Sequence, residues 1–199
     1  MNSARVIFLG VVVIGPVLAA SLSRAQKPTV PSREEQIAAA ILPLPVELRS
    51  TASVMGYSPN GKLVSLREGS GPMTCLASDP QAQEFHVACY HKVLEPFMAR
   101  GRALRAQGVK GPQVDTVRFR EIKAGTLKLP SGPSSLYTLT GGKFDPKAGS
   151  ATGAQPLFVV YIPYATATTT GLSERPAPGA PWIMYPGTPK AHIMFVPKM

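Results

Sequence analysis

MTCLASDPQAQEFHVACYH, residues 73–91, is the stretch that decides the fold. Two short runs rich in apolar, β-branched and aromatic residues, 73–77 and 85–90, flank a polar loop. Two such runs around one loop are typical of an antiparallel β-hairpin. The loop centre lies as far along the chain from Cys75 as from Cys89, so pairing of the runs places these residues directly opposite each other. The stretch therefore predicts two paired strands with facing cysteines.

A disulfide between Cys75 and Cys89 follows from this register. Directly opposed positions have Cβ atoms about 4.5–5.5 Å apart, close to the spacing in a disulfide. Closing this loop would stabilise the fold by about 3 kcal/mol in the chain-entropy model. The alternative is a reactive Cys89 thiol activated by His86 or His91.

The same two histidines, His86 and His91, are the alternative metal ligands. An odd separation along a strand points them to opposite faces, and a structural metal site needs several converging ligands. The preferred interpretation therefore holds no metal and no cofactor, and it leaves the histidines as ordinary polar residues of the sheet.

The rest of the chain adds further strands and a few helices. Ser32 with Glu35 forms a capping box that predicts a helix start, and Asn60-Gly61 between two alternating runs predicts a tight hairpin. Helices are expected at 33–42, from Glu95 to a stop at Gly108, and at 115–123, and further strands at 54–57, 62–67, 135–139, 157–164, 182–185 and 192–196. We expect an α+β fold, an antiparallel sheet of five to seven strands with two or three helices packed on it.

The first 25 residues are typical of a cleavable secretory signal peptide. Arg5 precedes an apolar run of 15 residues, 6–20, and small residues at Ser23 and Ala25 fit a signal peptidase site. An uncleaved membrane anchor is the alternative, but the run is short and interrupted by glycine and proline. We expect a leader at 26–31, a single domain at 32–199 that is not integrated in the membrane after cleavage, and a periplasmic or secreted location.

The chain is basic, with 21 Lys and Arg against 11 Asp and Glu and a net charge of +10. Loss of residues 1–25 leaves 19 basic and 11 acidic side chains, a net charge of +8. A basic exported protein can meet an anionic envelope component such as lipid headgroups or acidic polysaccharide. The charges are dispersed along the sequence without a tight cluster, which favours a mildly cationic surface and gives no indication of nucleic-acid binding.

The sequence contains none of the familiar hydrolase, phosphate-loop, zinc-protease or Cys-x-x-Cys motifs. Enzymatic activity is therefore not indicated, although an enzyme or metal protein using His86, His91 and Cys89 stays an alternative. The preferred function is a non-catalytic exported module that binds a small ligand or an envelope component. Aromatic and polar residues near the C-terminus would line its site or else pack in the core: Tyr164, Trp182, Tyr185, Lys190 and His192, with Tyr161 and Phe195 nearby.

Overall fold

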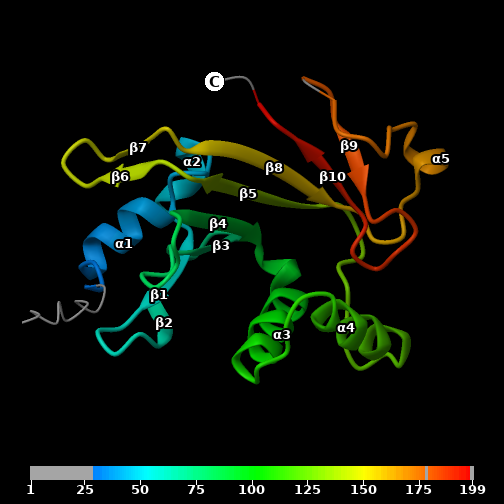
Figure 1. Ribbon diagram of the computed structural model, residues 1–199, viewed down its shortest axis with the longest axis horizontal. Helices are drawn as coiled ribbons and strands as arrows, with labels where there is room; N and C mark the ends of the chain where they lie inside the picture. Colours follow the sequence, from blue (N-terminus) through cyan, green and yellow to red (C-terminus); the bar gives the residue numbers. More distant parts are fainter. Residues whose placement is uncertain (1–28, 178, 198–199) are drawn as a thin grey trace, which may run out of the picture.

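A computed structural model describes residues 29–177 and 179–197 (Figure 1). The predicted signal peptide, 1–25, and the first half of the predicted leader, 26–28, lie outside the described residues. Within them, the chain has an α+β fold with one large mixed sheet and few helices. The elements are α1 (Arg33–Ala40), α2 (Val46–Arg49), β1 (Ser53–Tyr57), β2 (Leu63–Arg67), β3 (Met73–Leu76), β4 (His86–His91), η1 (Lys92–Leu94), α3 (Glu95–Ala106), α4 (Gln113–Lys123), β5 (Ser134–Thr140), β6 (Lys143–Asp145), β7 (Ser150–Thr152), β8 (Gln155–Tyr161), α5 (Ala167–Thr170), β9 (Trp182–Met184) and β10 (His192–Phe195).

The sheet differs from the expected one in its size and in one strand direction. Eight strands of the described residues form it, in the order β2–β1–β3–β4–β5–β8–β10–β9, and β6 with β7 forms a separate two-stranded ribbon. The prediction was an antiparallel sheet of five to seven strands. After the edge strand β2 the chain crosses past β1 and adds β3 on its other side, so β1 and β3 run parallel. Every other pair in the sheet is antiparallel.

The predicted hairpin register is confirmed. Cys75 on β3 is paired with Cys89 on β4, and the two residues form a disulfide. Both cysteines are buried in a core that α1 covers. The next residue of β4, Tyr90, belongs to a second core with residues of α3 and α4. Because neighbouring residues of a strand point to opposite faces, α1 and the α3–α4 pair cover opposite faces of the sheet.

Local signals explain how α1 is held in place. Glu35 N donates to Ser32 Oγ at 3.1 Å and Ser32 N donates to Glu35 Oε2 at 2.9 Å, which is the predicted capping box. Gln36, which is buried, then binds both backbone groups of Tyr57 at the end of β1. A Cβ on Gly56 would lie 2.6 Å from Gln36 Oε1, so the close approach of helix and strand requires glycine there.

The strand predicted at 157–164 occupies 155–161 instead. Pro163 follows within two residues, and Tyr164 has a positive φ of 63°, so the chain leaves the ladder after Tyr161. Tyr164 therefore belongs to a loop at the right-hand end of Figure 1, beside the turn between β9 and β10. No helix within 29–177 or 179–197 is long and apolar enough to cross a lipid bilayer.

Candidate functional site

Two loops at the β8–β10 end of the sheet dock on each other, and each holds a strained tyrosine. Tyr164 N donates to Thr188 O at 2.9 Å, and Gly187 N donates to Ala165 O at 2.7 Å. Within the described residues, Tyr164 (φ 63°) and Tyr185 (φ 52°) are the only non-glycine residues with positive φ. Such a conformation costs about 1–3 kcal/mol, and residues that adopt it cluster at functional sites.

His192 lies beside these loops at the start of β10. The ring is buried, and its Nδ1 donates to the Lys190 carbonyl oxygen at 2.7 Å. A carbonyl oxygen only accepts, so the proton resides on Nδ1 and Nε2 carries the free lone pair. The ring centroids of Tyr161 and Tyr185 lie 5.0 Å and 5.7 Å from that of His192. Burial lowers the pKa of His192, which favours the neutral ring at pH 7.

Lys190 joins the loop between β9 and β10 to helix α4. Its Nζ lies 2.9 Å from Asp115 Oδ2 and 4.4 Å from the centroid of the Tyr185 ring. Asp115 also accepts a hydrogen bond from Arg118. Partial burial alone would raise the pKa of Asp115, but the hydrogen bonds from Lys190 and Arg118 outweigh it and lower that pKa. Lys190 is thus a paired cation with a fixed position.

Arg118 is a buried arginine, only 4% exposed, that connects α4 to α3. Its Nη1 donates to the Phe97 carbonyl oxygen at 3.1 Å, and its guanidinium carbon lies 3.7 Å from the centroid of the Phe97 ring. Phe97 in turn meets Tyr161 edge to face at 6.3 Å between centroids. Burial raises the pKa of Tyr161 to about 12, so its phenol stays protonated. These contacts close a ring that we call the His192 cluster: Phe97, Asp115, Arg118, Tyr161, Tyr185, Lys190 and His192.

The structure brings together three of the five residues predicted for a ligand site. Tyr185, Lys190 and His192 belong to the cluster, and Tyr164 lies on the loop docked against them. Trp182 is buried on β9, where its Nε1 has no hydrogen-bond partner within the described residues. It shares a sheet face with His192, because it pairs with Met194, two residues along β10.

Phe195, three residues after His192, points to the opposite face of the sheet, so it does not join the aromatic group. Asp115 and Arg118 are the site residues that the sequence analysis missed. Asp115 was predicted only as the start of the helix at 115–123, and nothing in the chain near Arg118 indicates that its charge is buried.

The residues of the alternative enzyme or metal site do not converge. Cys89 is bonded to Cys75 and offers no thiol. His86 Nδ1 lies 2.8 Å from Thr140 Oγ1, whereas His91 Nδ1 accepts from Val93 N at 3.2 Å at the other end of β4. In residues 29–177 and 179–197, no three His, Cys, Asp or Glu side chains come together as metal ligands.

Half of the net charge of the chain resides on the basic hairpin, which we define as residues 95–128 with α3 and α4. This segment holds eight basic and three acidic side chains, a net charge of +5 out of +10. All three carboxylates are paired: Glu95 with Arg102 at 2.5 Å, Glu121 with Arg100 at 2.6 Å, and Asp115 with Lys190 and Arg118. The segment has five exposed cations without an ion-pair partner in the described residues: Arg105, Lys110, Arg120, Lys123 and Lys128.

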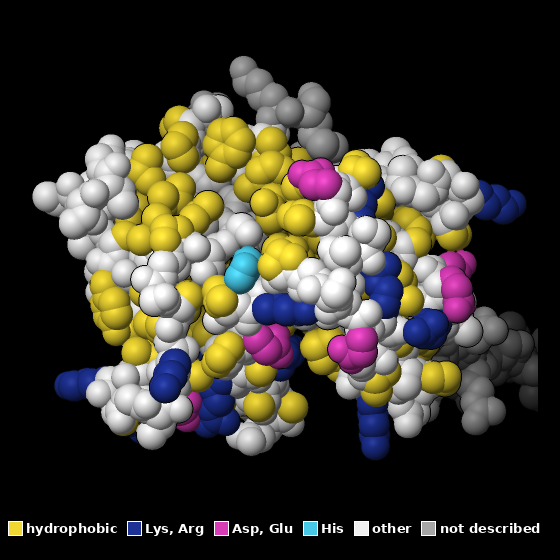
Figure 2. Space-filling model, turned by 180° about the vertical axis from the view of Figure 1, so that it is seen from behind, with side chains coloured by type: hydrophobic (Ala, Val, Ile, Leu, Met, Phe, Trp, Pro, Cys, Tyr) yellow, Lys and Arg dark blue, Asp and Glu magenta, His cyan; other side chains and the backbone are white. Residues whose placement is uncertain are grey.

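The interpretation of the charge as dispersed is therefore incomplete. Basic residues are spaced out along the sequence, but the ion pairs of the folded chain neutralise every acidic group between them. Lys and Arg side chains project from the lower left of Figure 2, where the basic hairpin lies. The hairpin also borders the His192 cluster, since Phe97, Asp115 and Arg118 belong to both. Comparison of the chain with protein-family models, with curated proteins and with solved structures finds no match.

Proposed function

We propose that this chain is a non-catalytic, exported binding module for an acidic polysaccharide of the cell envelope. In this proposal Tyr164 and Tyr185, which we call the tyrosine surface, stack on sugar rings, and the basic hairpin attracts the acidic groups of the polymer. The predicted signal peptide at 1–25 and the Cys75–Cys89 disulfide support export to an oxidising compartment, periplasmic or secreted.

The observation that carries the proposal is the strain at two exposed tyrosines. Tyr164 is 54% exposed and Tyr185 is 46% exposed, so neither ring is held in place mainly by burial. A loop that only needed a positive φ would be better served by glycine or asparagine, which adopt it at lower cost. The fold keeps a large aromatic residue at both positions, which favours a role for the rings themselves.

Tyrosine suits polysaccharide binding because it offers a large, rigid and amphipathic surface at a low cost in side-chain entropy. The hydrogen bonds between the two loops hold both tyrosines on one rigid support. Within the His192 cluster, the Tyr185 ring contacts both the Lys190 ammonium and the His192 imidazole, which hold it in position. The surface is thereby organised before a ligand arrives, which reduces the cost of binding.

The charge of the neighbouring helices favours an acidic partner over a neutral one. The five unpaired cations of the basic hairpin attract a polyanion over a distance of about a Debye length, roughly 8 Å at physiological salt. The hairpin has no strongly exposed aromatic side chain among these cations, because Phe97 is buried and Phe119 is half-buried. The basic hairpin therefore offers no strongly exposed ring on which a sugar can stack. In this proposal the tyrosine surface supplies the stacking contact.

The test is calorimetric titration of the mature chain, residues 26–199, with an oligogalacturonate and with a neutral cello-oligosaccharide of the same length. The acidic probe should bind more tightly, and raising the salt concentration should weaken its binding alone. Tyr164→Ala should lose about tenfold or more in affinity for the acidic probe, as expected when a central aromatic contact is truncated. Phe195→Ala, on the opposite face, is the matched control and should bind normally.

Charge variants test the role of the basic hairpin separately from that of the tyrosine surface. Arg120→Gln with Lys123→Gln should reduce the affinity and its salt dependence, whereas Lys143→Gln with Lys147→Gln, on the β6–β7 ribbon, should change neither. Equal binding of acidic and neutral probes would refute the role of the hairpin. Unchanged binding by Tyr164→Ala would refute the role of the tyrosine surface.

A further inference from the structure

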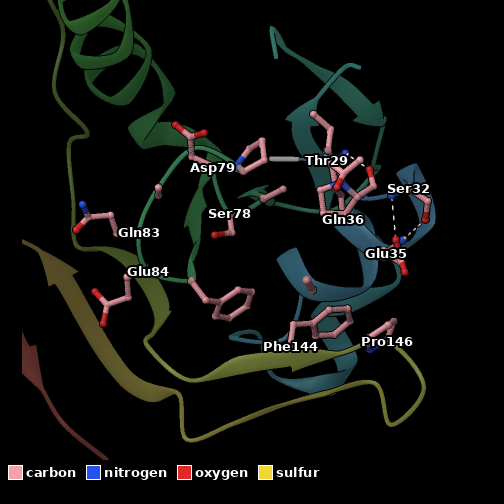
Figure 3. A pocket seen from close by; sticks show the side chains of 17 residues that line it. Thr29, Ser32, Glu35, Gln36, Ser78, Asp79, Gln83, Glu84, Phe144 and Pro146 are labelled. Atoms are coloured by element: carbon pink, nitrogen blue, oxygen red, sulfur yellow. Dashed lines mark hydrogen bonds between the residues drawn. The ribbon is translucent and has the colours of Figure 1, made fainter. Parts of the chain in front are cut away.

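A cavity lies at the other end of the molecule, away from the tyrosine surface (Figure 1). It has a volume of about 540 Å³ and opens between the start of α1, the connection from β3 to β4, and the β6–β7 ribbon (Figure 3). These three segments are far apart in sequence, so the cavity exists only in the folded chain. Its volume lies within the range of about 300–1,000 Å³ that is typical of small-molecule sites. We call it the ribbon cavity.

The inner wall of the ribbon cavity is apolar. Phe85, before β4, and Phe144, on β6, form a stacked pair with ring centroids 6.4 Å apart and planes inclined by 8°. The buried residues Ala39 and Ala77 also line the cavity, as do Pro31 and Pro146. In Figure 3 the ring of Phe144 lies on one side of the hollow. A hydrocarbon or aromatic group fits against such a wall.

The charged residues that line the ribbon cavity all have the same sign. Glu35, Asp79 and Glu84 line it, and none of its lining residues is Lys or Arg, although basic residues outnumber acidic ones by 21 to 11 in the chain. Glu35 is engaged with the Ser32 backbone in the capping box. Figure 3 shows the side chains of Asp79 and Glu84 turned outward to the rim. The cavity therefore combines an apolar interior with a negative rim.

We propose that the ribbon cavity binds an organic cation with an apolar body, such as an aromatic or alkyl amine. The apolar body lies against Phe85 and Phe144, and the ammonium group lies near the rim carboxylates of Asp79 and Glu84. The faces of the two aromatic rings add a cation–π attraction for the same charge. An anionic ligand of equal size is repelled by the rim, and a neutral one gains only the apolar contact. This site is independent of the tyrosine surface.

The test uses three probes that share a phenyl ring on a short chain: phenethylammonium, 2-phenylethanol and 3-phenylpropanoate. Each is titrated into the mature chain, residues 26–199, and binding is followed by ligand-observed NMR. Phenethylammonium should bind with a dissociation constant of about 1 mM, which is reasonable for a ligand this small. It should bind at least about fivefold more tightly than the alcohol, and the carboxylate should bind most weakly.

Variants separate the apolar wall from the charged rim. Phe144→Ala, on a ribbon outside the main sheet, should weaken all three probes by about fivefold or more. Glu84→Gln should weaken only phenethylammonium. Glu47→Gln on α2, which does not line the cavity, is the matched control and should bind as the unmodified chain does.

Thermal unfolding of each variant shows that it is folded. Three results would each overturn the proposal. They are equal affinity for the three probes, normal binding by Phe144→Ala, and no binding of the cation near 10 mM, which is about tenfold weaker than expected. None of these results bears on oligogalacturonate binding at the tyrosine surface.

Discussion

Replacing Arg118 with methionine tests whether this buried side chain holds α3, α4 and the β9–β10 loop together. The arginine donates to the Phe97 carbonyl oxygen at 3.1 Å, donates to Asp115, and places its guanidinium carbon 3.7 Å from the centroid of the Phe97 ring. Methionine keeps most of the apolar length of the side chain but supplies none of these polar contacts. Asp115 would then keep Lys190 as its remaining cationic partner.

The expected loss follows from these contacts. Two hydrogen bonds from a charged donor contribute about 1.5–3 kcal/mol each, and the contact with the Phe97 ring adds about 1 kcal/mol. The Arg118 Nε atom is buried without a partner in the described residues, and removing it returns about 1–3 kcal/mol. We expect a net loss of about 3 kcal/mol in the free energy of unfolding. For a chain of this size, that lowers the unfolding midpoint by roughly 6–12 °C.

Arg120→Met is the matched control, because Arg120 lies on the same helix, is exposed and forms no ion pair within the described residues. Its effect should stay within about 0.5 kcal/mol. Denaturant titration of both variants, with the disulfide intact, gives the free energies. If Arg118→Met costs no more than Arg120→Met, the buried guanidinium does not hold these elements together, and this reasoning is wrong.

Two further predictions concern the disulfide and the response to pH. Replacing both Cys75 and Cys89 with alanine should lower the free energy of unfolding by about 3 kcal/mol in a denaturant titration, because the open loop restores entropy to the unfolded chain. An unchanged free energy of unfolding would argue against a stabilising role of the disulfide. Burial lowers the pKa values of both His192 and His86, so the unfolded chain takes up protons first as the pH falls below about 6.5, and stability decreases there. His192→Asn and His86→Gln should each flatten the stability profile in that window, and a profile equally steep in the double variant would exclude the two histidines as its cause.

The parts of the fold that sequence alone predicts depend on local chemistry. The register of Cys75 and Cys89 follows from one short loop, and the capping box at Ser32 follows from a spacing of three residues. Both are correct in the structure. The parallel pair of β1 and β3 was missed because a pattern of strands does not show on which side of β1 the chain returns.

Tyr164 illustrates a different limit of prediction from sequence. Its aromatic ring and its position after a β-rich run favour a strand, yet Pro163 interrupts the ladder and the residue adopts a positive φ. Strand propensity was overridden by the docking of this loop on the turn that contains Thr188. Strain of this kind has no signature in a single sequence, because any residue other than glycine or asparagine argues against it.

The candidate site was predictable only where its residues are close in the chain. Tyr185, Lys190 and His192 lie within eight residues of each other, so their convergence needs only one turn. Asp115 is 75 residues from Lys190, and no local pattern indicates their contact. The basic hairpin was missed for a related reason, because the pairing of its carboxylates is a property of the folded chain.

The most direct test of the central proposal is the substitution Tyr185→Asn, measured for stability and for oligogalacturonate binding in the same samples. Asparagine tolerates the positive φ of this position, so relief of strain offsets the lost contacts with Lys190 and His192. We expect a free energy of unfolding within about 1 kcal/mol of the unmodified chain and an affinity about tenfold or more lower. Binding of oligogalacturonate as tight as that of the unmodified chain would contradict the proposal that Tyr185 is kept in this strained conformation for its ring.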